Sequence, residues 1–292
     1  MIGPLLTSTL RVSTPLIFAA LGGMFCERAG VINIALEGMM LLGAFGAAVG
    51  TLKLHSVWLG LLCGMGAGTA VAALYGLLVI RLRANQIVAG TGINMLAFGL
   101  TPCLCKAVYD VTGSTPGIPL GERFQSAPIY LSWLLVALCW VFMRRTAPGL
   151  WVAFAGEHPA ALESAGIRVN RVRWAAVLAS GALAGLGGVS LSVFLSSSFS
   201  RNMTAGRGFM ALAALIFGKW RPVQAALACL LFGFAEAAQI RLQNALLWGD
   251  KPLPGQFIQV LPYVVTVLVL AGFVGHSRPP KALGTAFRRD GS

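Results

Sequence analysis

Charged side chains are scarce in this sequence, and acidic ones are the scarcest. Charged residues make up 11% of the 292 residues, and only nine are Asp or Glu. A soluble domain carries roughly 25% charged residues. Hydrophobic residues make up 57%, and many apolar runs approach the ~20 residues that a helix needs to cross a bilayer. The composition excludes an ordinary soluble domain and indicates an all-α protein that spans a membrane many times.

Motifs for metals, redox chemistry and catalysis are also missing. The three His residues are scattered, and the six Cys residues show no CxxC or Cys/His ligand spacing. No GxxxxGK[ST] phosphate loop occurs, and no Ser/His/Asp set or carboxylate pair stands out. We therefore expect no metal site, no catalytic residue and no cofactor bound by this chain. Any ATP and Mg²⁺ would be held by another subunit.

The sequence has 22 basic and nine acidic residues, and the topology of a membrane protein can account for this excess of basic residues. Cytoplasmic loops collect Lys and Arg. With the N-terminus outside, fourteen of the 22 fall on the inner side. No nucleic-acid motif accompanies the charge, so we expect membrane lipid and no nucleic acid as a partner. The prediction is a helical bundle of about 8–10 spans forming one transmembrane domain over 1–292, with a mobile cytoplasmic tail at 276–292. The predicted spans are 4–25, 31–50, 57–80, 87–105, 129–143, 174–195, 205–219, 222–241 and 256–275.

The connection 144–173 is the longest polar stretch between two apolar blocks, and it holds five Arg. One short helix is predicted inside it. Pro159 suits a first helical position, and Gly166 suits a left-handed stop. Ala161, Leu162 and Ala165 would share one face as a small apolar knob. The pattern alone fits either a topology-setting loop with an incidental turn or a docking element for a cytoplasmic partner.

Polar residues within the spans are candidates for a solute pathway, because burying them is costly. Asn33 and Glu37 are four residues apart, so they would share a helical face. Asn94 lies in the fourth span. Amide and carboxylate groups suit the hydroxyls and ring nitrogens of a neutral polar solute. The alternatives are hydrogen bonds between helices, and for Glu37 an ion pair with Arg28 near the inner surface.

Glu236 is the fourth candidate for the pathway, and it lies in the eighth span. The alternative for it is a structural role with a local pair to Arg241. The turn Gly206-Arg207-Gly208 opens the seventh segment, which looks like a broken or tilted helix. Its exposed N–H groups could bind an anionic or hydroxyl group, or the turn could simply be flexible. AGVINIALEG (29–38) and AGRGFMALAA (205–214) agree at four positions, which fits a possible inverted repeat.

Several blocks occur in an order that resembles one family. The chain is similar to the membrane permeases of bacterial ABC importers, in the branched-chain amino acid/simple-sugar permease group and its nucleoside-type branch. The resemblance covers about residues 10–275. The blocks are GGMFCERAGVINIALEGMMLLGAF (22–45), RANQIVAGTGIN (83–94), GEHPAALESAGI (156–167) followed by SGALAGLGG (180–188), and GRGFMALAALIFGKWRP (206–222).

The resemblance implies a type II ABC importer permease in the bacterial cytoplasmic (inner) membrane. It implies an ABC ATPase subunit with two nucleotide sites, a second permease subunit in a hetero- or homodimer, and an extracytoplasmic solute-binding protein. The chain itself would be no enzyme. The solute would be a nucleoside or nucleobase, with a simple sugar as the alternative and an ion-coupled secondary transporter as the competing class. The coupling helix would comprise Gly156, Glu157, His158, Pro159, Ala160, Ala161 and Gly166, although His158 departs from the usual pattern.

Overall fold

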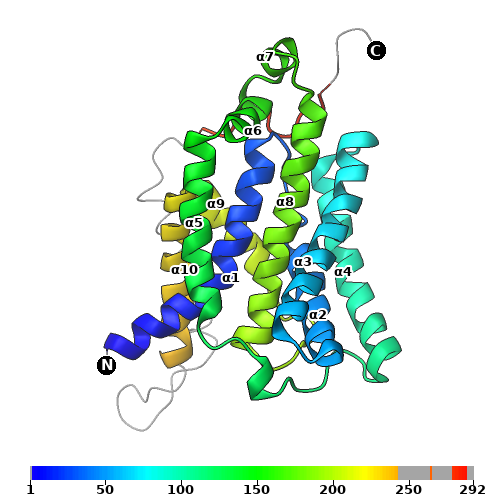
Figure 1. Ribbon diagram of the computed structural model, residues 1–292, viewed down its shortest axis with the longest axis vertical. Coiled ribbons are helices and arrows are strands. Elements are labelled where there is room, and N and C mark those ends of the chain that lie inside the picture. Colours follow the sequence, from blue (N-terminus) through cyan, green and yellow to red (C-terminus); the bar gives the residue numbers. More distant parts are fainter. Residues whose placement is uncertain (1, 243–263, 265–277, 288–292) are drawn as a thin grey trace.

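The computed structural model describes residues 2–242, 264 and 278–287. Every regular element in this part of the chain is a helix, as Figure 1 shows. The helices are α1 (Ile2–Arg28), α2 (Leu36–Leu54), α3 (Val57–Gly76) with a π-helical continuation (Leu77–Arg81), α4 (Gln86–Tyr109), a 3-10 turn (Leu120–Glu122), α5 (Ala127–Arg145), α6 (Ala147–Glu157), α7 (Pro159–Ser164), α8 (Val169–Val189) with a π-helical continuation (Ser190–Leu195), α9 (Arg207–Phe217) and α10 (Pro222–Leu242).

Seven helices in the described part of the chain are long and apolar enough to cross a membrane. They are α1, α2, α3, α4, α5, α8 and α10, in agreement with seven of the predicted spans. The predicted ninth span, 256–275, lies outside the described residues. Within the predicted seventh span, 205–219, only the 11 residues of α9 form a helix. At 1.5 Å per residue α9 is about 17 Å long, about half of the ~30 Å hydrocarbon core.

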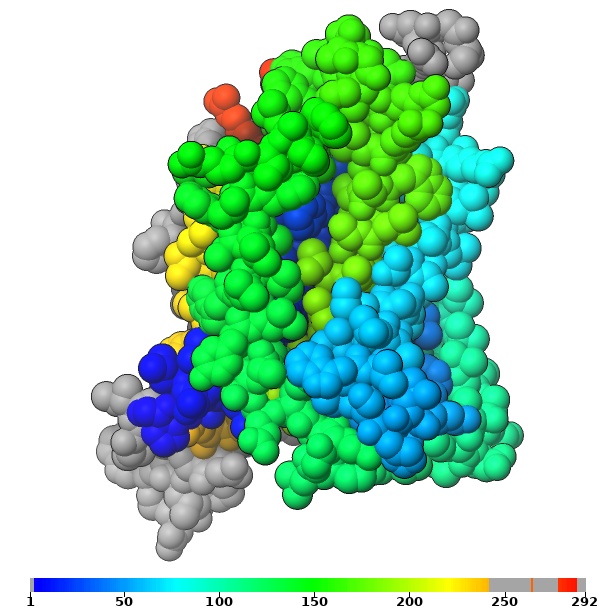
Figure 2. All heavy atoms as spheres, viewed as in Figure 1, coloured from blue at the N-terminus to red at the C-terminus, as the bar shows by residue number. Residues whose placement is uncertain are grey.

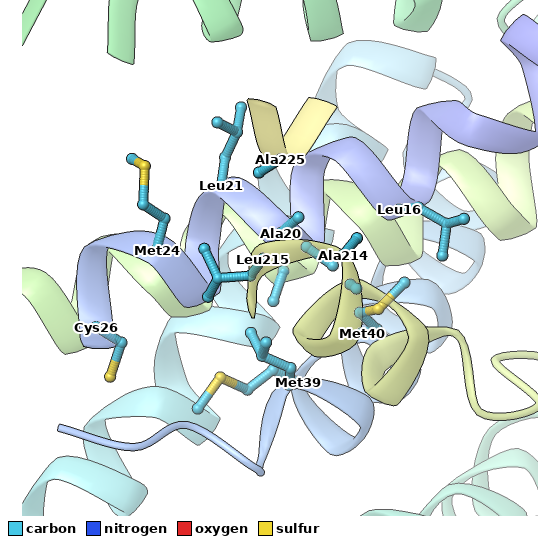
Figure 3. Packing of buried hydrophobic residues seen from close by; sticks show 14 of the residues in the cluster. Leu16, Ala20, Leu21, Met24, Cys26, Met39, Met40, Ala214, Leu215 and Ala225 are labelled. Atoms are coloured by element: carbon cyan, nitrogen blue, oxygen red, sulfur yellow. The ribbon is translucent and has the colours of Figure 1, made fainter. Parts of the chain in front are cut away.

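The bundle has a buried centre and an apolar periphery. Within their most apolar windows, 83% of α1 and 78% of α8 are buried, against 22% of the α5 segment. The periphery exposes large apolar side chains such as Trp58, Met95 and Tyr130, as a surface in contact with lipid does. In the core, Leu16 and Met24 of α1 pack with Met39 of α2 and Leu215 of α9 (Figure 3). Helices α1 and α8 therefore form the centre of the bundle, and α5 lies at its periphery.

Glycines allow the central helices to approach closely. A Cβ added to Gly43 of α2 would lie 2.6 Å from the Cα of Gly185 in α8. One added to Gly68 of α3 would lie 2.8 Å from the same atom. Small residues of this kind let helix backbones pack directly in lipid. The pairs Gly64/Gly68 of α3 and Gly181/Gly185 of α8 have GxxxG spacing and lie at the α3–α8 contact.

The second span begins with an interruption, which we call the α1–α2 break (residues 29–35). The helix predicted over 31–50 starts only at Leu36. Gly30 adopts a φ of 89°, which ends the helical path of α1. The backbone N–H of Ile32 donates to Gln86 of α4 at 2.8 Å, and its carbonyl accepts from the hydroxyl of Tyr75 in α3. Side chains of neighbouring helices thus satisfy backbone groups that lipid could not.

The chain crosses the bundle between α8 and α10, partly without regular structure. Near the start of this passage, Ile118 donates its N–H to the carbonyl of Ser197 at 2.6 Å, at the far end of α4 and α8. At its other end, the indole N–H of Trp220 donates to Glu27 at the end of α1. The seventh segment therefore crosses, with α9 covering only the second half of the path.

One end of the bundle carries α6, α7 and the segment 278–287 (top of Figure 1). The connection 144–173 contains two helices, so the prediction of a single short helix is incomplete. Thr146 accepts a hydrogen bond from the N–H of Gly149, and Pro148 follows in the first turn, so α6 starts with ordinary capping chemistry. The segment 278–287 was expected to be mobile. Instead it makes several hydrogen bonds with this end of the bundle, described below.

Candidate functional site

The short helix α7 projects from the bundle and begins and ends as its sequence predicts (Figure 1). Pro159 occupies the first turn, where its missing N–H leaves no bond unmade. Gly166 has a φ of 80°, and its N–H donates to the carbonyl of Glu163 at 2.9 Å. The left-handed stop is therefore confirmed. These features hold six helical residues in a fixed position on a projecting loop.

The apolar knob predicted on α7 is wrong in one respect. Leu162 points inward, is only 4% exposed, and packs in a cluster that includes Ala155. Ala160, Ala161 and Ala165 are exposed. A large apolar side chain gains more from burial than alanine does. Leu162 therefore anchors α7, and the outward surface is formed by small residues.

The residues before α7 differ in exposure. Gly156 is buried, and a Cβ there would collide with the backbone carbonyl of Arg28 at the end of α1. Its own carbonyl accepts from the N–H of Ala282 at 2.8 Å. Glu157 and His158 are exposed. Among the predicted coupling residues, Gly156 thus belongs to a junction inside the protein, whereas its two neighbours face outward.

Glu37 caps the interrupted seventh segment. Its carboxylate accepts from the backbone N–H of Gly206 at 2.8 Å and from that of Gly208 at 2.6 Å. These N–H groups belong to the N-terminus of α9, where the helix dipole favours a negative charge. The turn expected to bind an anionic group therefore has one from the protein itself. The suggested pair between Glu37 and Arg28 is not formed, because Arg28 donates to the carbonyl of Trp220 at 3.0 Å.

Asn94 and Asn33 both brace the start of α2. Asn94 accepts from the N–H of Gly38 at 2.8 Å and donates to the carbonyl of Ile34 at 3.0 Å. Asn33 donates to the hydroxyl of Ser180 in α8 at 2.8 Å. Asn33 lies in the α1–α2 break and not on a helix, so the prediction that it shares a helical face with the nearby carboxylate is wrong.

Glu236 of α10 pairs with Arg207, the first residue of α9. This contact replaces the suggested local pair with Arg241. The second carboxylate oxygen of Glu236 is buried without a hydrogen-bond partner, and so are Nε of Arg207, the hydroxyl of Thr204 and Oδ1 of Asn33. Buried polar atoms without partners are uncommon in proteins. These atoms retain hydrogen-bonding capacity inside the membrane domain.

A groove of about 660 Å³ lies between α1, α5, α6 and α8, and Figure 2 shows the hollow between the green α5–α6 and the yellow-green α8. It is mostly apolar, with Arg168 and Arg171 on its lining. None of the four predicted pathway residues lines it. Across residues 2–242, 264 and 278–287, no group of three His, Cys, Asp or Glu side chains could hold a metal ion.

The sequence did not single out Arg173 or the contacts of Glu27. Arg173 was counted only as one of five loop charges, yet it is 3% exposed and lies four residues into α8. Glu27 is also buried, with its carboxylate 2.6 Å from the indole nitrogen of Trp220. A charged residue next to a long apolar run was the available signal in both cases. The sequence does not reveal the partners, because all but one of these contacts span more than a hundred residues.

Comparison with known proteins identifies the family. Residues 5–270 match the model described as branched-chain amino acid transport system / permease component. The guanosine ABC transporter permease NupQ of Bacillus subtilis is 38% identical over 305 residues, covering 96% of this chain and 95% of the relative. The nucleoside ABC transporter permease NupC of Lactococcus lactis is 37% identical over 306 residues, covering 97% and 96%.

More distant relatives include the glucose ABC transporter permease TsgB13 of Haloferax volcanii, which is 27% identical over 316 residues and covers 98% of this chain and 80% of the relative. A solved ABC transporter in an inward-facing conformation aligns over 92% of this chain and 85% of that chain, with 15% identity and a TM-score of 0.48. The match to the family model and the two bacterial relatives cover nearly the whole sequence. This chain is therefore a multi-pass membrane protein of the branched-chain amino acid transport system / permease component family, an ABC transporter permease and not itself an enzyme.

Proposed function

We propose that this permease imports a nucleoside or nucleobase across the bacterial cytoplasmic membrane, driven by a separate ABC ATPase. The N-terminus faces outside, and the end with α6 and α7 faces the cytoplasm. A second permease subunit completes the pathway, and an extracytoplasmic binding protein delivers the solute. Two bacterial relatives above 35% identity are named as guanosine or nucleoside permeases, which supports this solute class.

The projecting α7 is the observation that carries the coupling role. The buried Leu162 fixes this helix to the bundle, and Ala160 and Ala161 face outward. Small exposed side chains leave room for a helix to enter a groove on a partner. The exposed Glu157 and His158 add polar groups at the rim of the same surface. In this role α7 transmits closure of the ATPase dimer to the membrane helices.

The four predicted pathway residues divide into two pairs. Both carboxylate oxygens of Glu37 accept hydrogen bonds from the start of α9. The amide oxygen and the amide nitrogen of Asn94 both bond to backbone groups at the start of α2. Asn33 and Glu236 each keep one buried oxygen without a partner. We expect Asn33 and Glu236 to meet the solute when the pathway opens, because a polar solute can supply the missing hydrogen bond. Glu37 and Asn94 would then shape the path without binding the solute.

Copurification and uptake test the proposal together. The tagged chain is expected to retain an ABC ATPase through detergent purification. In vesicles with the complete complex, radiolabelled guanosine should accumulate only when ATP is supplied. Accumulation in ATP-free vesicles containing this chain alone would instead show an ion-coupled secondary transporter.

A simple sugar is the second candidate solute, since a relative is named as a glucose permease. Binding of guanosine, adenine and glucose to the partner solute-binding protein distinguishes the two classes. Tight binding of glucose with no binding of a nucleoside or nucleobase would overturn the proposed substrate and leave the ABC mechanism intact.

A further inference from the structure

Arg173 is a buried cation whose hydrogen bonds go to backbone carbonyls. The side chain is 3% exposed, and neither ion pair found among the described residues includes it. Its guanidinium donates to the carbonyl of Ala29 at 3.1 Å, to that of Thr285 at 2.8 Å and to that of Ala155 at 3.4 Å. These three carbonyls come from parts of the chain that are far apart in sequence. One side chain therefore joins three segments.

The local field explains how this buried charge is tolerated. Ala29 directly follows the last residue of α1, and Ala155 lies in the last turn of α6. Helix C-termini carry partial negative charge, so two of them converge on the guanidinium. The planar fork of arginine can donate to several acceptors at once, whereas a lysine ammonium acts as a compact point charge. Arginine is thus the side chain suited to this junction.

The segment 278–287, which we call the strap, completes the junction and is drawn in red at the top of Figure 1. Besides accepting from Arg173, it donates from Ala282 to the carbonyl of Gly156 at 2.8 Å. It also donates from Gly284 to the carbonyl of Gly30 at 3.1 Å. Phe287 packs against the cluster that holds Leu162 of α7. The strap therefore contacts both α6 and the α1–α2 break, and reaches the anchor of α7.

We propose that Arg173 is a positioning residue for transport and that the strap is part of the coupling apparatus. Together they lock the end of α6, one residue before α7, to Ala29 and Gly30 at the start of the α1–α2 break. That break carries Asn33 and leads directly into Glu37. A displacement of α7 is thereby passed to the start of α2 instead of being absorbed by a loose joint. The coupling role rests on the proposed function; the mechanical junction does not.

Spin labelling tests the junction in the permease alone. A label is attached to Lys281→Cys in the strap, or to Ala160→Cys on α7, after the exposed Cys63 and Cys103 are replaced by Ala. Arg173→Met should increase the rotational mobility of the label at 281 several-fold and that of the label at 160 to a smaller extent. Arg81→Met is the control, because Arg81 is exposed at the same end of the bundle. Unchanged spectra in Arg173→Met would overturn the junction.

Transport stoichiometry tests the coupling role in the assembled complex. Arg173→Met should retain the ATPase subunit and its ATP hydrolysis, while solute taken up per ATP falls at least tenfold. Arg173→Lys should fall between this variant and the unmodified chain. A chain that stops after residue 277 should behave like Arg173→Met, and it decides the question if Arg173→Met fails to insert.

The outcomes separate the two proposals. An assembled variant complex with an unchanged ratio of uptake to ATP would overturn the strap as a coupling element and leave the proposed function standing. If the unmodified chain retains no ATPase, the proposed function fails, and the spin-label spectra still decide whether the junction exists.

Discussion

The carboxylate of Glu37 lies 2.6 Å from the backbone nitrogen of Gly208, so the first turn of α2 caps the first turn of α9. Both helices start inside the bundle after an irregular stretch, and their N-termini meet at this side chain. Asn94 of α4 braces α2 in the same manner, and Arg207 of α9 is paired with Glu236 of α10. Polar contacts thus connect four helices in series, from α4 through α2 and α9 to α10.

Loss of charge at Glu37 should destabilise the protein. Glu37→Gln keeps the shape, but an amide has only one acceptor oxygen for the two N–H groups of Gly206 and Gly208. The expected cost is about 1–3 kcal/mol, the typical penalty for leaving a buried donor unsatisfied. It should appear as a lower Tm of the purified permease in detergent. Asp110→Asn makes the same acid-to-amide change at an exposed site, and a Tm equally low for both variants would contradict the capping role.

A methyl group at Gly208 should be disruptive. A Cβ there would lie 2.6 Å from both the backbone nitrogen and the Cα of Glu37, so α9 would have to move away from α2. Gly208→Ala is expected to reduce the amount of folded protein and its Tm. Gly66→Ala is the matched control, because a Cβ at Gly66 meets nothing within 4 Å. At that helical site, alanine should be neutral or stabilising by up to about 1 kcal/mol.

The Arg207–Glu236 pair should show strong coupling between its two partners. Removing one member of a fully buried ion pair typically costs about 3–5 kcal/mol, because the other charge is left unpaired. The Arg207–Glu236 pair is only partly buried, so the loss should be smaller. Arg207→Met and Glu236→Met should therefore each lower stability more than the double variant does. Tm values of the two single variants and the double variant measure this coupling. Additive losses would indicate that the two side chains act independently.

Glu236→Ala tests whether this carboxylate also meets the solute. If it does, uptake should fall at least tenfold in complexes whose ATPase subunit is retained, because a polar solute loses a charge-assisted hydrogen bond. Uptake and Tm are measured on the same preparation. A lower Tm with unchanged uptake would assign Glu236 a purely structural role.

A bulky charge on α7 should prevent docking. Ala161 is exposed on the outward surface, so Ala161→Arg leaves the fold intact while adding a long cation where close packing is proposed. The variant is expected to insert normally but to lose the ATPase subunit on purification and to lose uptake. Ala84→Arg adds the same charge to the exposed α3–α4 connection as a control. Normal uptake by Ala161→Arg would contradict the coupling role of α7.

The sequence by itself determined the class of protein and the position of most helices. Apolar runs of bilayer length cannot be stable in water, and inside lipid a helix is the simplest way to satisfy every backbone group. Local capping chemistry likewise fixed α7, since Pro159 and Gly166 act through their own backbone geometry. These features depend on neighbours in sequence, so the sequence was sufficient to predict them.

Only the tertiary structure decided where the polar side chains find their partners. Glu37 meets Gly208 across 171 residues, and Arg173 meets Ala29 across 144. Such pairs depend on how close-packed helices are placed relative to one another, which helical periodicity does not encode. The break before Leu36 was missed for the same reason. Gly30 marks the end of α1, but the backbone after it is stabilised by Tyr75 and Gln86 of other helices, which the sequence of the segment does not reveal.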